Sequence, residues 1–312
     1  SSIGSRFSVI VVVLVVPATR AMAHKRLRGK KRPKMGSVRK PLKNAKKDAK
    51  KTKGKSDNQG TAPKAASVVA ASTGGLSKKE AKMQALLVKQ HQALYAPGER
   101  ILLVGEGNFS FARALCKQLG SGAGVYATCL DSDATLTQKY PDAAECRKEI
   151  EESYGGTCLT GVDATRLHKV KEFRDAFKKI VFNFPHLGTG EKDVEKIIAL
   201  HRKFLAAFFV SAAKCLDPRQ HSSIHVALKT SEPYKSFKIV QIVRAACPEL
   251  DLSTVAPFMP AAWDGYAHRR TIGFSEKYSK ADSEELAKGA KVYVFGRSRT
   301  AVEDEDEDGS DE

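Results

Sequence analysis

The stretch ILLVGEGNFSF at residues 101–111 constrains the fold more than any other part of the sequence. Its first part, LLV at 102–104, is a short apolar run that is typical of a buried parallel strand. Gly105 and Gly107 then let the backbone bend tightly and approach a ligand without a Cβ atom in the way. Ser110 stands where a Gly-x-Gly-x-x-Gly motif has its third glycine, and it is placed to cap the following helix. This strand–turn–helix pattern predicts a turn that holds a nucleotide cofactor, and a tight turn without a ligand is the alternative.

Strand-like and helix-like segments alternate along the rest of the chain. Apolar runs predict strands at Ile101–Val104, Val125–Leu130, Cys158–Val162, Ile180–Phe184, Ile224–Leu228, Leu252–Phe258 and Val292–Phe295. Helical spacing predicts helices at Ser77–Tyr95, Phe111–Leu119, Ala134–Tyr140, Ala143–Ser153, Lys169–Lys178, Asp193–Leu216 and Tyr234–Cys247. The alternation indicates right-handed βαβ units, and hence an α/β fold with a doubly wound, mostly parallel, Rossmann-like sheet. The last run, VYVF, follows a long irregular segment and is expected to return antiparallel at the end of the sheet.

Charge is distributed very unevenly along the chain. Residues 1–60 hold 18 Lys and Arg against 2 Asp and Glu, whereas residues 303–312 hold 8 acidic residues. The sequence therefore predicts a basic disordered arm and linker at 22–75, a folded domain at 76–300 and an acidic disordered tail at 301–312. A dense run of Lys and Arg suits a polyanion, because each neutralised phosphate releases counterions. RNA or DNA is the expected partner, and an anionic membrane surface is the second choice.

The first 21 residues have two interpretations. The apolar run Val9–Val16 and the triplet Ala21-Met22-Ala23 imitate a secretory signal, but the run is too short to span a bilayer. We interpret residues 1–21 as an extension upstream of a true start at Met22. A mitochondrial or secretory leader is the alternative, and the lack of Asp and Glu before Asp48 keeps the mitochondrial option open.

The cysteines point to a reducing compartment. All six lie inside apolar runs and none belongs to a C-x-x-C pair; they are Cys116, Cys129, Cys146, Cys158, Cys215 and Cys247. Reduced core thiols are therefore expected, with neither a zinc site nor a disulfide framework. A nuclear or cytoplasmic location follows from this reading.

Carboxylates follow two of the predicted strands, at the edge where an open parallel sheet binds its ligand. Asp131 follows the second strand and is placed to bond a ribose hydroxyl pair, although it lies 26 residues after Gly105 instead of about 20. Asp163 follows the third strand, near the place where an adenine amino group would rest. Either carboxylate also fits a helix N-cap. The ligand role is favoured for Asp131, and the two roles are equally open for Asp163.

The fourth strand runs into Asn183, Phe184, Pro185 and His186. An Asn side chain and a Pro carbonyl at a strand end can accept hydrogen bonds from a planar N–H edge, and a following ring can stack on the base held there. The pattern resembles the Asn-Pro-Pro-aromatic loop of base-modifying methyltransferases, with Phe184 in place of the first Pro and His186 at the ring position. His186 can assist proton removal or be a structural histidine. Such chemistry requires a base taken out of its stack.

A cluster of rings and cations follows Trp263. Tyr266 and His268 can stack on nucleobases, while Arg269 and Arg270 can contact phosphates. The alternative is a loop folded over the sheet edge with solvated arginines.

Five sequence words together resemble one family. They are GEGNFSFARAL at 105–115, ATCLDSDATLTQKYP at 127–141, GVDATRLH at 161–168, FNFPHLG at 182–188 and GYAHRRTIG at 265–273. The chain is similar over residues 98–298 to the Rossmann-like class I S-adenosylmethionine-dependent methyltransferases typified by the fungal 25S rRNA (uridine-N3)-methyltransferase. GEGNFSF and FNFPH are far more specific than a generic glycine turn.

The resemblance implies a cofactor, a substrate and residue roles. S-adenosyl-L-methionine would be the cofactor, and the substrate would be N3 of a uridine in large-subunit rRNA or a pre-ribosomal particle, modified in the nucleolus during ribosome biogenesis. The methionine end of the cofactor is assigned to Gly105, Glu106, Gly107, Asn108, Phe109 and Ser110, the ribose to Asp131 and the adenine to Asp163. Catalytic roles go to Asn183, Pro185 and His186, and substrate binding goes to Phe184, Tyr266, His268, Arg269 and Arg270.

Two other function classes stay open at this point. A methyltransferase fold without catalysis, acting as an RNA-binding or ribosome-assembly protein, would have the same basic arm. A dinucleotide-dependent oxidoreductase is disfavoured by the missing third glycine and by the arm. The sequence does not indicate an oligomeric state, and no membrane partner is expected.

Overall fold

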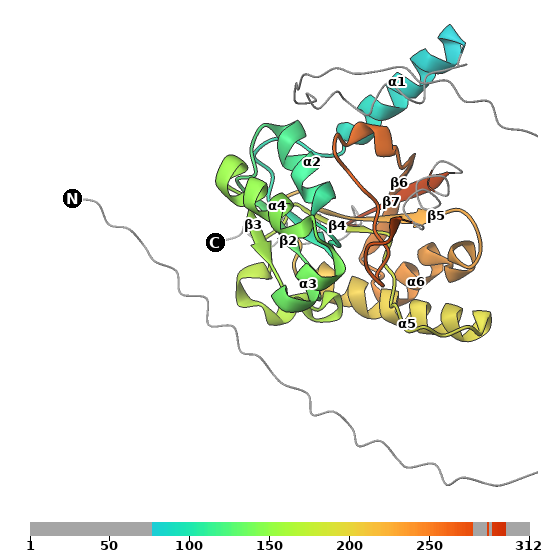
Figure 1. Ribbon diagram of the computed structural model, residues 1–312. Coiled ribbons are helices and arrows are strands. Elements are labelled where there is room, and N and C mark those ends of the chain that lie inside the picture. Colours follow the sequence, from blue (N-terminus) through green and yellow to red (C-terminus); the bar gives the residue numbers. More distant parts are fainter. Residues whose placement is uncertain (1–76, 277–285, 287–288, 298–312) are drawn as a thin grey trace, which may run out of the picture. The chain divides into compact units, whose positions relative to one another are not determined.

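The computed structural model describes residues 77–276, 286 and 289–297 (Figure 1). The predicted leader, basic arm, linker and acidic tail lie outside the described residues. So does the end of the predicted domain at residue 300.

The described part is built on a seven-stranded sheet with the order β3-β2-β1-β4-β5-β7-β6. Its strands are β1 (Ile101–Val104), β2 (Val125–Thr128), β3 (Thr157–Leu159), β4 (Lys179–Asn183), β5 (Ser223–Lys229), β6 (Leu250–Pro257) and β7 (Ala290–Arg297). Neighbours from β3 to β5 pair in parallel, whereas β7 pairs antiparallel with both β5 and β6. The mostly parallel Rossmann-like sheet is confirmed, and every predicted strand is present within three residues at each end.

The place of β7 differs from the expectation. The strand is antiparallel, as predicted, but it lies between β5 and β6 instead of at the end of the sheet. Its register runs from Ser223 opposite Gly296 to Lys229 opposite Ala290, so it covers the whole length of β5. The edge is left to β6, whose residues Asp251–Val255 are exposed.

Helices cover both faces of the sheet (Figure 1). They are α1 (Lys78–Gln92), α2 (Ser110–Leu119), α3 (Asp133–Lys139), α4 (Ala143–Lys148), α5 (Val194–Ala213) and α6 (Ile239–Ala246). Alternate residues of β1 point to opposite layers, because side chains alternate along a strand. Ile101 and Leu103 join the core under α2, whereas Leu102 and Val104 join the core under α5 and α6. The strands are therefore buried on both faces, as parallel strands usually are.

Four helix predictions need correction. The first helix ends at Gln92 instead of Tyr95. It begins with a capping box, in which Ser77 and Glu80 bond each other's backbone N–H groups, and the residues around its end pack on the core, whereas Met83 is 53% exposed. The segment 169–178 is not a helix and consists of short 3₁₀ turns and irregular chain. The fourth predicted helix changes to a π-helical turn at Glu149. The last one is interrupted at Lys238, whose φ is 54°.

Three general properties of the described residues bear on function. None of the described helices has the length and apolar character needed to cross a membrane. All six cysteines are buried and free, which confirms their predicted core positions. Within the same residues, no group of three or more His, Cys, Asp or Glu is arranged to hold a metal ion.

Candidate cofactor and base-binding site

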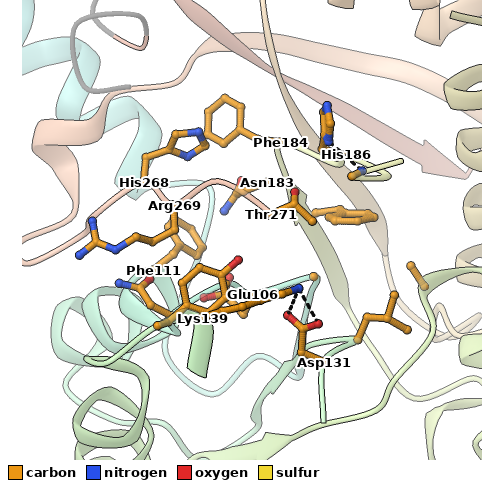
Figure 2. Close-up of a pocket in the computed structure, with 18 of the residues that line it drawn as sticks. Glu106, Phe111, Asp131, Lys139, Asn183, Phe184, His186, His268, Arg269 and Thr271 are labelled. Carbon is orange, nitrogen blue, oxygen red and sulfur yellow. Dashed lines mark hydrogen bonds and ion pairs between the residues drawn. The ribbon is translucent and has the colours of Figure 1, made fainter. Parts of the chain in front are cut away.

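The candidate site is a pocket of about 540 Å³ at the carboxyl ends of the central strands. The sheet order places β1 beside β4, and the chain fills one side of β1 before it returns to the other. This reversal of strand order is where open α/β sheets bind ligands. Figure 2 shows Phe184, His186 and His268 on one side of the pocket and Glu106, Lys139 and Asp131 on the other.

The glycine turn after β1 forms one wall of the pocket. Gly105 has a φ of +70°, and a Cβ atom placed on it would lie 2.9 Å from Cζ of Phe182 and still closer to its Cε2. The N–H of Glu106 donates to the carbonyl of Thr128 at 2.9 Å, which fixes the turn to the end of β2. Only glycine combines the left-handed conformation with this close packing. The turn is therefore rigid, and its backbone faces the pocket.

Ser110 does not cap the helix, which corrects the sequence prediction. The N-cap position of α2 is Phe109, a core residue with a φ of 61°, and Ser110 is the first helical residue. The buried Ser110 hydroxyl lies 2.8 Å from Oδ1 of Asn108 and accepts the N–H of Ala267 at 3.0 Å. The serine at the third motif position thus ties the glycine turn to a segment more than 150 residues away.

That segment, residues 264–274, lies across the glycine turn, and we call it the strap. Helix α2 holds its first part, because Arg113 donates to the Gly265 carbonyl at 3.2 Å and Lys117 pairs with Asp264. The last turn of α3 and the residue after it hold its second part: the Tyr140 hydroxyl donates to the Arg270 carbonyl at 2.8 Å, and the N–H of Phe274 donates to the Lys139 carbonyl at 2.8 Å. The strap is therefore anchored along its length.

A polar network behind the pocket joins the strap to the glycine turn. Oδ2 of Asp142 accepts from Nδ2 of Asn108 at 2.8 Å and from Nη2 of Arg269 at 2.9 Å. Asn108 is buried, and the Arg269 side chain is 14% exposed. Arg269 thus lines the pocket wall, and its guanidinium pairs with the Asp142 carboxylate. The sequence had instead predicted that this guanidinium contacts a phosphate. Asp142 was missed because nothing in its local sequence distinguishes it from a residue at a helix start.

Glu106 is the most electrostatically perturbed acid of the site. Its Oε2 accepts the N–H of Ala112 in the first turn of α2, at 3.3 Å. Desolvation by burial nevertheless raises the pKa of Glu106 to about 7. A cationic ligand group bound beside this carboxylate would favour its ionised form.

Replacing Glu106 with Gln is expected to change how stability depends on pH. The folded state holds the proton up to about pH 7, while the unfolded chain releases it near pH 4.5. Stability from this group therefore falls as pH rises from about 4.5 to about 7. Glu106→Gln should remove that fall. In urea unfolding, the free energy of unfolding of the variant should therefore increase relative to that of the wild type as the pH rises to about 7. Parallel stability curves for the two proteins would contradict a desolvated Glu106.

The two predicted carboxylates at strand ends both line the pocket. Asp131 receives Nζ of Lys139 on both oxygens, at 2.9 and 3.0 Å, a pairing that the sequence reading did not foresee (Figure 2). Asp163 caps the following 3₁₀ turn, because its Oδ1 accepts the N–H and the hydroxyl of Thr165, both at 2.8 Å. The cap role of Asp163 is confirmed. Because both of these bonds go to Oδ1, the other carboxylate oxygen of Asp163 can still accept a hydrogen bond from a ligand.

The loop after β4 closes the opposite wall. Phe184 has a φ of 54°, and its ring packs edge-on against Phe258 and His268 with centroids 4.9 and 4.8 Å away. The Leu187 N–H donates to Nε2 of the buried His201 at 3.3 Å, which fixes the loop to α5. Asn183 lines the pocket, and its Nδ2 is buried without a hydrogen-bond partner among the described residues. Pro185 is buried and does not line the pocket.

His186 lines the pocket, and its hydrogen bond indicates which ring nitrogen carries the proton. Its Nδ1 accepts the N–H of Gly188 at 3.0 Å, so the neutral ring carries its proton on Nε2. Burial, the neighbouring His201 and Lys229 lower the pKa of His186, which favours the neutral ring. The lone pair on Nδ1 is thus engaged by Gly188, and the role of His186 in proton removal stays a prediction.

The comparisons with known proteins agree with this geometry. The family model described as rRNA (uridine-N3-)-methyltransferase BTM5-like matches residues 102–270, which is more than half of the chain. The chain belongs to this BMT5-like family. The resemblance read from the sequence words is thereby confirmed.

Relatives of this BMT5-like protein differ in length. It is 32% identical over 211 residues to the heavy metal-associated isoprenylated plant protein 41 of Arabidopsis thaliana, an alignment that covers 67% of this chain and 39% of the relative. It is 36% identical to the human ferredoxin-fold anticodon-binding domain-containing protein 1, over 64% of this chain and 31% of that protein. The 25S rRNA (uridine(2634)-N(3))-methyltransferase of Saccharomyces cerevisiae is 27% identical over 64% of this chain and 73% of its own length. The chain thus spans less than half of the first two relatives.

The BMT5-like match runs from β1 to Arg270 in the strap, and most predicted site residues inside it meet in one pocket. The exceptions are Phe109, Pro185 and Arg270, which do not line the pocket. Tyr266 lines the wall, with its hydroxyl 3.2 Å from Nδ1 of His268, and burial raises the pKa of Tyr266 well above its usual range. The ring pair predicted to stack on bases is therefore built into the pocket wall.

Proposed function

We propose that this protein transfers a methyl group from S-adenosylmethionine to N3 of a uridine in rRNA. The observation that carries the proposal is that one pocket joins the glycine turn and its carboxylates to the Asn183–His186 loop. Family membership supports the reaction, and the name of the yeast relative supports large-subunit rRNA as the target. Ribosome biogenesis in the nucleolus belongs to the same proposal.

The pocket fits the proposed cofactor in size and in charge. Its volume of about 540 Å³ lies within the range of about 300–1,000 Å³ that is usual for small-molecule sites. The cofactor carries an ammonium and a sulfonium, and Glu106 supplies a desolvated carboxylate that a cation would complete. Asp131 and Asp163 supply acceptors for hydroxyl and amino groups at neighbouring strand ends. A nicotinamide dinucleotide would instead bring its pyrophosphate to the glycine turn, beside the Glu106 carboxylate.

The proposed residue roles follow from these positions. Backbone groups of Gly105 and Gly107, together with Glu106, would hold the methionine end, and Asp163 would hold the adenine through its free oxygen. Asp131 would hold the ribose, with its carboxylate oriented by the ion pair to Lys139. When bound, S-adenosylmethionine supplies a methyl group that is electrophilic because it sits on a sulfonium.

The chain's own contribution is alignment and exclusion of water. Asn183 would hold the edge of the uracil, while the packed rings of Phe184 and His268 keep that side of the pocket dry. Nε2–H of His186 would donate to a uracil carbonyl. The proton on N3 must still leave, and because His186 offers no lone pair, water at the pocket mouth is the proposed acceptor.

Methylation of unmodified large-subunit rRNA by the full chain tests the proposal. We expect 3-methyluridine in the product, and we expect binding of S-adenosylmethionine, but not of NAD, in calorimetry. Asn183→Ala should keep cofactor affinity and lose turnover by about 100-fold, because misplacement of a reacting edge has effects of this size. Full turnover by Asn183→Ala would remove its assigned role. A chain that binds rRNA but no cofactor would instead be the inactive ribosome-assembly protein.

A further inference from the structure

One aromatic ring beside the pocket is exposed. Among the described Phe, Tyr and Trp residues, Phe274 is the one classed as exposed, at 43% of its surface. It lies at the end of the strap, two residues after Ile272, which lines the pocket and is 68% exposed. The family match ends at residue 270, so Phe274 lies outside it. Its exposure is unusual because aromatic rings of this size are normally buried.

The ring of Phe274 is held from two directions. The guanidinium carbon of Arg269 lies 4.9 Å from the ring centroid, and Arg269 is itself fixed by its ion pair with Asp142. The Phe274 N–H donates to the Lys139 carbonyl at 2.8 Å. The preceding Gly273 is buried with a φ of +112°, and a Cβ atom on it would lie 3.2 Å from the same carbonyl. A ligand that stacks on this ring would therefore find it already oriented, which reduces the entropy cost of binding.

The position of the ring indicates which ligand it fits. A uridine that enters the pocket must leave its stack, and its neighbour in the strand then loses a stacking partner. An exposed ring that contacts two residues of the pocket lining, Arg269 and Lys139, can replace that partner for any base, because every base has a π-face. Tyr266 and His268, to which the sequence reading gave this role, are engaged with each other and with the rings behind them.

We propose that Phe274 is the stacking platform for the unpaired nucleobase next to the target uridine. This inference rests on the proposed function, because the neighbouring base is displaced only if the pocket takes a base. Arg269 acts as a positioning residue, since it holds one side of the ring while the exposed part meets the RNA.

The test uses the full chain and a 12-nucleotide oligouridine in which one position is 2-aminopurine. Stacking quenches 2-aminopurine, so binding to the wild type should lower its fluorescence. Phe274→Ala should abolish the quenching and weaken RNA affinity by about 5- to 150-fold, the range found for loss of one stacked base. Phe274→Trp should keep both. Cofactor affinity should be unchanged in either variant, because Phe274 does not line the pocket.

Two further variants separate stacking from other effects. Phe274→Leu keeps an apolar side chain but has no π-face. It should lose the quenching as Phe274→Ala does, whichever of the two variants is the less stable. Val255→Ala removes another exposed apolar side chain of 43% exposure, on β6, and should behave as the wild type. Quenching and affinity that survive in the alanine and leucine variants would overturn the proposal. If the wild-type chain quenches 2-aminopurine but methylates no RNA, the stacking role of Phe274 would hold and only the proposed reaction would be refuted.

Discussion

Gly105→Ala is expected to abolish cofactor binding and to lower the free energy of unfolding by about 2–4 kcal/mol. The new Cβ would lie 2.9 Å from Cζ of Phe182 and closer still to its Cε2. That ring is 5% exposed and packs on Phe204 and Phe208, with centroids 6.0 and 5.1 Å away, so it has little room to move. Overpacking of this kind costs about 1–3 kcal/mol, and the left-handed conformation adds about 1 kcal/mol. Relief by a shift of the turn would displace the backbone that faces the pocket.

Gly120→Ala is the matched control for this prediction. Gly120 has a φ of +71° at the end of α2, and a Cβ atom there would meet nothing within 4 Å. It carries the same conformational cost without the clash, so it should lose about 1 kcal/mol and bind cofactor normally. Urea unfolding and calorimetry with S-adenosylmethionine compare the two variants. Equal losses would show that Phe182 does not resist the added carbon.

The fold could be predicted from the sequence because its signals are local. Buried parallel strands appear as short apolar runs, and glycine or polar turns mark their ends, so β1 was predicted at Ile101–Val104 without error. The sheet position of β7 was not predictable in this way. Its insertion beside β5 depends on pairing between residues more than 60 positions apart, for which the strand itself carries no sign.

The failed helix at 169–178 shows how tertiary contacts override local spacing. Phe173 and Phe177 are four residues apart and both buried, which is the pattern of a helix face. In the structure, the N–H of Asp175 donates to the Lys214 carbonyl, and the N–H groups of Ala176 and Phe177 donate to the Cys215 carbonyl. These bonds to the end of α5 replace helical ones. The two rings reach the core from an irregular chain instead.

The candidate site was predictable where function depends on residue type at a strand end. Glu106, Asp131, Asp163 and Asn183 meet in one pocket because carboxyl ends of parallel strands share an edge. The supporting contacts were not predictable, since they join distant segments. The pairing of Ser110 with Ala267 across the strap is one case. The convergence of Asn108 and Arg269 on Asp142 is another.

Loss of the Asp142 carboxylate is the second change with a large expected effect. Asp142→Ala should lower the free energy of unfolding by about 1–3 kcal/mol. The buried Asn108 amide and the guanidinium of Arg269, whose side chain is 14% exposed, would both lose their shared partner. The figure stays below that of a fully buried pair because the Asp142 side chain itself is 38% exposed. Both the glycine turn and the strap lose their shared anchor, so affinity for cofactor and for RNA should fall together. Asp264→Ala, which breaks the exposed Lys117–Asp264 pair on the same strap, should change little.

A double-mutant cycle with Arg269→Met decides whether Asp142 acts through the charge of that arginine. If the cost of Asp142→Ala arises from a stranded cation, removing the cation as well should recover part of the stability, and the double variant should lose less than the sum of the single losses. The same cycle on RNA affinity addresses the strap, because Arg269 also holds the Phe274 ring. Strictly additive losses would mean that Asn108 alone depends on Asp142, and that the strap is positioned by its bonds to α2 and the end of α3. Coupling in both measurements would instead establish one network that sets the cofactor turn and the RNA-facing strap in register.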